Sequence, residues 1–139
     1  MKPPLLRREE RGASAVEFAL VAPLLLLMLF GIIVTALYFW QHAALNRAAF
    51  ESARCAAIAD TDCADEAAIR SHAVSVAEAA GVTVSEQDVT VELDTSCGGL
   101  SSMVSVSVAK NIANPTPGLL PNLPTRLVGE SCLPRINRN

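Results

Sequence analysis

The sequence predicts an α+β fold. A long N-terminal transmembrane helix continues into a small extracytoplasmic domain with a second helix and an antiparallel sheet of about three to four strands. Three observations lead to this prediction: residues 18–40 form an apolar run without a charged side chain, residues 64–80 have the pattern of a second helix, and alternating segments follow. We therefore expect a cytoplasmic leader over residues 1–12, a transmembrane helix over 13–40 and an extracytoplasmic domain over 41–139.

The apolar run is long enough to cross a membrane. A helix rises about 1.5 Å per residue, so Phe18 to Trp40 would span about 34 Å, against a bilayer core of about 30 Å. Tyr38 and Phe39 join Trp40 in an aromatic cluster that is typical of a membrane interface. Pro23 removes one backbone hydrogen bond and crowds the preceding turn, so we expect a kink or local unwinding close to it.

The charges predict the topology of this helix. The net charge is −3, with a basic leader and an acidic remainder. This balance argues against a nucleic-acid-binding protein, which needs a clustered basic surface. Counting Lys and Arg on the two sides of the apolar run favours a cytoplasmic leader and an outer C-terminal domain. The basic residues before the run are Lys2, Arg7, Arg8 and Arg11, and those soon after it are Arg47 and Arg54.

Residues 41–59 are expected to continue the first helix. Small residues recur at every fourth position, and such a face packs closely against another element, here a sheet of the same chain. The polar side chains between them do not form one clean stripe. A loop over 60–64 follows, and then a helix over about 64–80, which Asp62 or Asp65 would cap and Gly81 would end. The small residues are Ala44, Ala48, Ser52 and Ala56, and Ile69, Val76 and Ala80 are the expected inward face of the second helix.

The second half of the chain has the pattern of a sheet. We expect a short strand at 82–84, then strands at 88–94 and 103–110, in which valine or leucine alternates with polar residues. Gly98 and Gly99 indicate a hairpin turn between the two longer strands. Residues 111–124 contain four prolines and cannot form a regular element, and residues 125–133 have the pattern of a last strand.

The four cysteines all lie on the outer side of the predicted topology, where an even number suggests two disulfides. Three pairings are possible. We favour Cys55–Cys63, which would tie the long helix to the loop after it. We also favour Cys97–Cys132, because a last strand antiparallel to 103–110 would return to the glycine turn.

No catalytic constellation stands out. There is no glycine-rich phosphate loop, HExxH or GxSxG motif, so we expect no enzyme activity, no cofactor and no small-molecule substrate. His42 and His72 are expected to be surface or packing residues rather than metal ligands. The acidic group Asp60, Asp62, Asp65 and Glu66 lacks the spacing of a calcium loop and is expected to be a solvated loop.

The start of the chain resembles a known family. A basic leader ends at Gly12, a glutamate, Glu17, stands at the fifth position after that glycine, and a long apolar helix follows. This layout resembles a type IV prepilin-like signal. The wider run RGASAVEFALVAPLLLLMLFGI is similar to the opening of TadE-like proteins, the pilin-like proteins of tight-adherence (Flp-type) pilus systems.

The resemblance implies a structural role in pilus assembly. It implies a minor pilin or pseudopilin that a prepilin peptidase cuts between Gly12 and Ala13. In that family the pair matched here by Glu17 and Phe18 belongs to assembly, where the acid pairs with the new α-amino group of the same or a neighbouring subunit. The implied partners are other pilin-like subunits and the inner-membrane assembly platform, and the implied place is the bacterial inner membrane, with the C-terminal domain in the periplasm and, after assembly, in a pilus or at the cell surface.

Two other interpretations stay open. The chain would be an uncleaved bitopic anchor if its outer domain binds a cell-envelope partner and it never enters a filament. It would be a secreted disulfide-bonded domain if the apolar run were a removable secretory signal, but such signals have a shorter apolar region.

Overall fold

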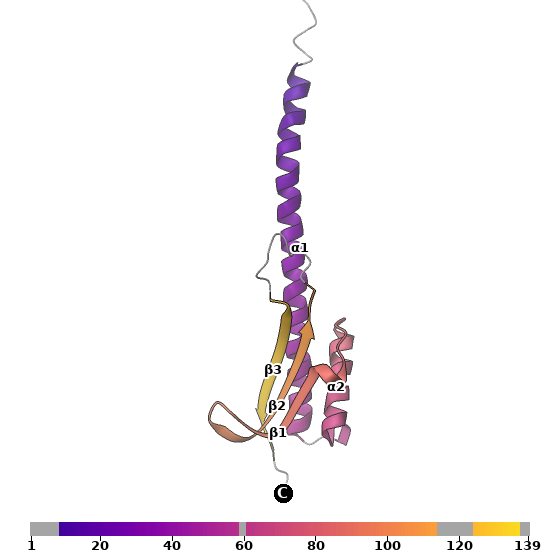
Figure 1. Ribbon diagram of the computed structural model, residues 1–139, viewed down its shortest axis with the longest axis vertical. Helices are drawn as coiled ribbons and strands as arrows, with labels where there is room; N and C mark the ends of the chain where they lie inside the picture. Colours follow the sequence, from indigo (N-terminus) through magenta and orange to yellow (C-terminus); the bar gives the residue numbers. More distant parts are fainter. Residues whose placement is uncertain (1–8, 59–60, 114–123, 137–139) are drawn as a thin grey trace, which may run out of the picture. The chain divides into compact units, whose positions relative to one another are not determined.

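The computed structural model describes residues 9–58, 61–113 and 124–136, with side chains from Ser14 onward. The elements follow in the order α1 (Glu9–Ala57), η1 (Thr61–Cys63), α2 (Glu66–Ala79), η2 (Glu86–Asp88), β1 (Val89–Cys97), β2 (Leu100–Asn111) and β3 (Arg126–Pro134) (Figure 1). The α+β class and the three-stranded antiparallel sheet confirm the prediction. Most of the predicted leader and of the proline-rich segment lie outside the described residues.

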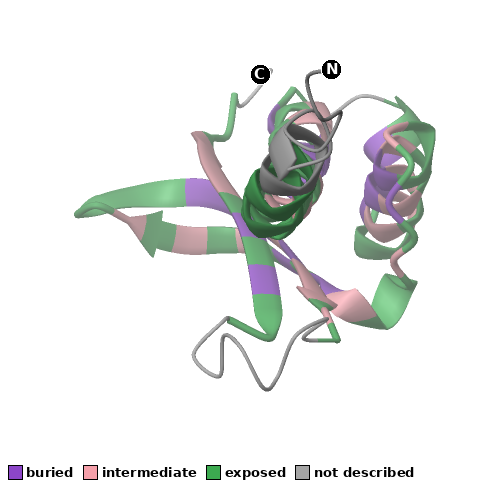
Figure 2. Cartoon of the chain, turned by 90° about the horizontal axis from the view of Figure 1, so that it is seen from above, coloured by how far each residue is buried: buried purple, intermediate pink, exposed green. Residues whose placement is uncertain are grey.

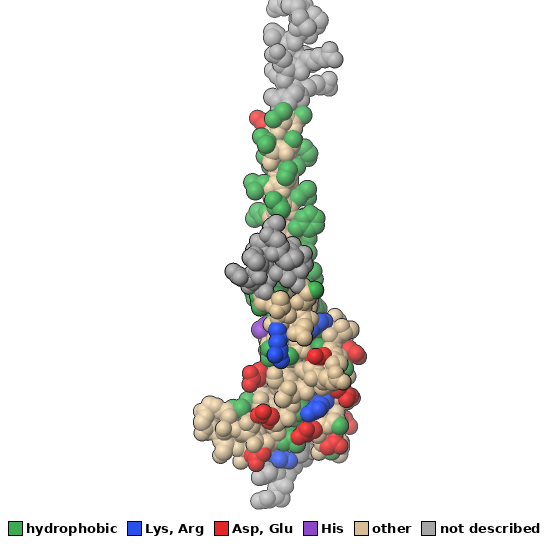
Figure 3. Space-filling model, viewed as in Figure 1, with side chains coloured by type: hydrophobic (Ala, Val, Ile, Leu, Met, Phe, Trp, Pro, Cys, Tyr) green, Lys and Arg blue, Asp and Glu red, His purple; other side chains and the backbone are tan. Residues whose placement is uncertain are grey.

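The chain divides into two compact units, residues 1–38 and 39–139, and α1 contributes to both. In the first unit most of the described large apolar side chains are exposed, and Figure 3 shows apolar side chains along the helix in green. Among the described residues α1 is the one helix that is long and apolar enough to cross a membrane. This part of the chain is therefore a candidate membrane anchor.

The second unit is built around the C-terminal part of α1. The small-residue face predicted there is buried, and Figure 2 shows this part of α1 beside the sheet and α2. Leu45 is completely buried next to it, and Gly129 of β3 comes so close that a Cβ there would overlap the backbone of Leu45 and Asn46. Small side chains thus let the helix approach both neighbours. The buried residues of this face are Ala44, Ala48, Ala49, Ser52, Ala53, Ala56 and Ala57.

The sheet has the order β1-β2-β3 and antiparallel pairing throughout. Val91 pairs with Val106 in the first ladder, and Val108 pairs with Gly129 in the second. Val104, Val106 and Val108 are fully buried, while the residues between them are half-buried. The period-2 pattern of the sequence therefore marks the face that packs inward.

The hairpin between β1 and β2 is irregular. Gly98, Gly99 and Ser102 all have positive φ, and the register shifts between Glu92 and Thr95 and again before Cys97. Glycine adopts such a conformation without a steric penalty, which explains the glycine pair at the turn. The predicted hairpin is confirmed, and its strands extend further than predicted on both sides of the turn.

Two local expectations are wrong. Residues 82–84 form no strand, because Val82 donates its N–H to Ala77 and so closes the end of α2 instead of joining a ladder. On the buried face of α2 the predicted Ile69 is confirmed, but its companions are Ala73 and Ala77 instead of Val76 and Ala80, which are only half-buried. Beyond Ile69 this face is built from alanines, whose small side chains allow a close contact.

Candidate functional site: the apolar helix and its continuation

The predicted cleavage point lies inside the helix. Because α1 begins at Glu9, Gly12 and Ala13 are helical, and so is the end of the segment predicted as leader. A peptidase would need to extend the backbone at this point. Gly12 makes this easier, since glycine lowers helix stability by about 1 kcal/mol relative to alanine.

Glu17 is an exposed carboxylate on α1. Among the described residues it has no hydrogen bond or ion pair. Phe18 beside it is 74% exposed. A carboxylate at the edge of a bilayer is costly without a partner, and the expected pairing of Glu17 with a cation of its own or a neighbouring chain stays a prediction.

Pro23 does not interrupt the helix. The residues around it, on both sides, are assigned to α1, so the local unwinding expected there is not seen among the described residues. A kink at Pro23 stays a prediction. Further along, Thr35 donates its hydroxyl to the carbonyl of Gly31 at 2.7 Å, which satisfies a polar group within the apolar run.

The structure contains two disulfides. The helix-end disulfide joins Cys55 to Cys63 with a Cα–Cα distance of 5.8 Å, and the hairpin disulfide joins Cys97 to Cys132 at 6.6 Å. Both distances lie within the range for disulfides. The pairing is the one favoured from the sequence, and its formation in the cell stays a prediction.

His72 lies next to the helix-end disulfide. Its Nδ1 is 3.3 Å from the hydroxyl of Ser52, a completely buried residue of α1. The sulfurs of Cys55 and Cys63 and a ring nitrogen of His72 all lie within 4.8 Å of one another. Both sulfurs are bonded to each other, so the cluster offers a metal no thiolate in this state.

The acidic residues after α1 have local structural roles. Asp65 caps α2 by accepting the N–H of Ala68 at 2.8 Å, and Glu66 pairs with Arg70 at 3.4 Å. Asp62 is exposed in η1, and Asp60 lies outside the described residues. Asp65 and Glu66 thus have partners within α2, and the solvated loop stays a prediction.

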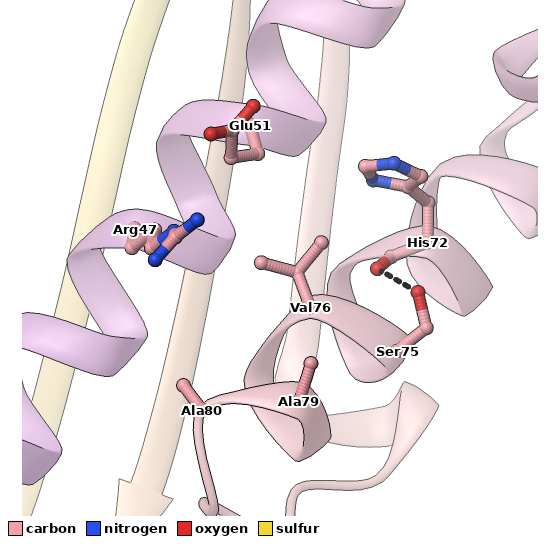
Figure 4. Close-up of a pocket in the computed structure, with 7 residues that line it drawn as sticks. All are labelled: Arg47, Glu51, His72, Ser75, Val76, Ala79 and Ala80. Carbon is pink, nitrogen blue, oxygen red and sulfur yellow. Dashed lines mark hydrogen bonds between the residues drawn. The ribbon is translucent and has the colours of Figure 1, made fainter.

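The sequence analysis missed a groove between α1 and α2. Arg47 and Glu51 line one side, and His72, Ser75 and residues at the end of α2 line the other (Figure 4). The signal was present in the polar residues after residue 45, which formed no clean stripe. These polar residues form no single stripe because α1 is covered on two sides, by the sheet and by α2, and the groove opens between α1 and α2.

Comparison with known proteins finds a similarity over the N-terminal part of the chain. The family model described as TadE-like protein matches residues 12–54. The match includes the predicted cleavage residues, Glu17 and the whole apolar run, and confirms the resemblance over this stretch. No curated protein and no solved structure matches the chain significantly.

Proposed function

We propose that this chain, which is TadE-like over residues 12–54, is a minor pilin or pseudopilin that supports assembly of a tight-adherence (Flp-type) pilus and thereby surface adhesion. The family points to a protein associated with such a pilus. The finer assignment rests on one observation: the matched stretch joins the glycine–glutamate spacing to a helix that can cross a membrane.

In this proposal the protein acts through its architecture. A prepilin peptidase removes residues 1–12 on the cytoplasmic side, the helix holds the subunit in the inner membrane, and the C-terminal domain lies in the periplasm. The carboxylate of Glu17, which has no partner among the described residues, then receives the α-amino group of Ala13, from its own or a neighbouring chain. Such a pair is stabilising in the bilayer only when both charges are engaged, so it favours one register between subunits.

The decisive experiment is N-terminal sequencing of the protein from native membranes, with and without the prepilin peptidase. We expect the chain to begin at Ala13 when the peptidase is present and at Met1 when it is absent. A start at Met1 in both strains would contradict the proposal and favour the uncleaved anchor.

Glu17 gives a second, independent test. Glu17→Gln removes the charge while keeping the shape, and Glu17→Asp keeps the charge. We expect the first variant to be processed normally but to lose pilus assembly and surface adhesion, and the second to retain part of both. Full assembly with Glu17→Gln would show that the acid has no role in subunit registration.

A further inference from the structure

The groove between α1 and α2 has a volume of about 390 Å³. All the residues that line the groove belong to the second unit. Figure 4 shows Arg47 and Glu51 on successive turns of α1, facing the end of α2, where Val76, Ala79 and Ala80 form an apolar wall. The groove thus combines one cation, one anion and a small apolar surface.

The two charges are available. No described residue forms an ion pair or hydrogen bond with the side chain of Arg47 or of Glu51, although they stand one turn apart. The polar groups on the opposite side are engaged: Ser75 donates its hydroxyl to the carbonyl of His72 at 2.8 Å, and the His72 ring contacts Ser52. A ligand of this groove would therefore be held by Arg47 and Glu51.

The groove lies beside Trp40, a residue of the aromatic cluster predicted to mark the membrane interface. The indole N–H of Trp40 donates to the carbonyl of Ala80 at 3.2 Å, so the end of α2 lies beside the aromatic cluster that marks the membrane interface. Arg47 follows Trp40 by two helical turns, about 10 Å along the axis.

We propose that the groove binds the headgroup of an aminophospholipid, with the phosphate on Arg47 and the primary ammonium on Glu51. The order of the charges along α1 supports this: Arg47 is nearer Trp40, where the phosphate of a lipid at the predicted interface would lie, and Glu51 is one turn farther from Trp40, as the ammonium would be. Side chains four residues apart on a helix are neighbours, about 5–6 Å between Cβ atoms, and an ethanolamine headgroup holds its two charges only two carbons apart.

This chemistry distinguishes between common lipids. An ethanolamine ammonium donates N–H bonds to the Glu51 carboxylate, whereas the quaternary ammonium of choline has no N–H to donate. A glycerol headgroup has the phosphate alone and leaves Glu51 without a cation. The proposal depends on the membrane anchoring stated above but not on cleavage or on entry into a pilus.

The test is native mass spectrometry of the full chain in detergent micelles with equal amounts of phosphatidylethanolamine, phosphatidylcholine and phosphatidylglycerol. We expect retention of the ethanolamine lipid over the choline lipid by roughly fivefold, since one charge-assisted hydrogen bond near the surface separates them. Arg47→Gln and Glu51→Gln should each bring the ratio close to one.

Two control variants match these changes. Arg54→Gln removes the same charge from the same helix, three residues beyond Glu51 and outside the lining of the groove, and Glu78→Gln removes an exposed carboxylate from α2. Both should keep the wild-type ratio. Far-ultraviolet circular dichroism and intact disulfides will show that each variant is folded.

Three results would overturn the proposal. The first is equal retention of the ethanolamine and choline lipids by the wild-type chain. The second is retention of soluble phosphoethanolamine as strong as that of the ethanolamine lipid, which would make the groove a site for a free ligand. The third is loss of a co-purified protein from Arg47→Gln without a change in lipid retention, which would assign the groove to a protein partner.

Discussion

Replacing Gly129 by alanine should destabilise the C-terminal domain strongly. Gly129 lies in β3, paired with Val108, and it is buried against α1. A Cβ at this position would overlap the carbonyl group of Leu45 and the amide nitrogen of Asn46. Its φ is not positive, so the cost is one of space and not of backbone conformation.

The magnitude follows from what the new methyl group meets. Extra carbon in a well-packed core typically costs about 1–3 kcal/mol, because side chains rotate or the backbone shifts. Backbone atoms of a helix cannot rotate aside, so we expect about 3 kcal/mol, at the upper end of that range. If the free energy of unfolding falls by about 1.5 kcal/mol per molar urea, the urea concentration at the unfolding midpoint would fall by about 2 M.

Pulse proteolysis of the full chain in detergent, at increasing urea concentration, measures this midpoint. Gly31→Ala is the matched control, because a Cβ at Gly31 meets nothing within 4 Å. We expect the control to leave the midpoint of the C-terminal domain unchanged. A Gly129→Ala midpoint within about 0.3 M of wild type, or about 0.5 kcal/mol, would refute the close approach of β3 to α1.

Further predictions concern the other contacts of this domain. Changing both cysteines of the hairpin disulfide to alanine should lower the free energy of unfolding by about 4 kcal/mol, against about 2.5 kcal/mol for the helix-end disulfide, because the hairpin disulfide closes the longer loop. Urea midpoints measured under oxidising conditions show which variant loses more. Ser52→Ala should cost about 1 kcal/mol by leaving His72 Nδ1 without its partner, and a midpoint equal to wild type would contradict that bond. The hydroxyl and the N–H of Ser85 hold the pKa of Asp88 below its usual range. This carboxylate therefore adds stability above about pH 4 that is lost as the pH falls through the lowered pKa, and NMR titration of Ser85→Ala should show that pKa rising.

The sequence predicts most of this fold because its strongest signals are local. The apolar run, the small residues of α1 and the alternation in β1 and β2 each repeat with the period of the element they form. The glycine pair fixes the hairpin for an equally local reason. These elements therefore appear where their patterns place them.

The misses depend on contacts between distant parts of the chain. Val82 has strand-like neighbours, yet its N–H closes α2, and the buried face of that helix is shifted because alanines suit a close contact better than Val76. The groove could not be predicted either, because Arg47 and His72 come together only when α2 packs against α1. Of the predicted site residues, Glu17 is predicted from the linear motif alone, and its role stays a prediction.

The close contact at Gly129 has a mechanical consequence. The backbone of β3 lies directly on α1 at Gly129, and the N–H of Ile136 donates to the carbonyl of Ala57 at 3.0 Å. The helix is therefore joined to β3 at the middle of the strand and again just past the strand's C-terminal end. Within the C-terminal domain, a pull along the axis of α1 would load these attachments together in shear instead of peeling them apart one by one. A domain attached in this way would resist traction on its anchor far better than its small core suggests.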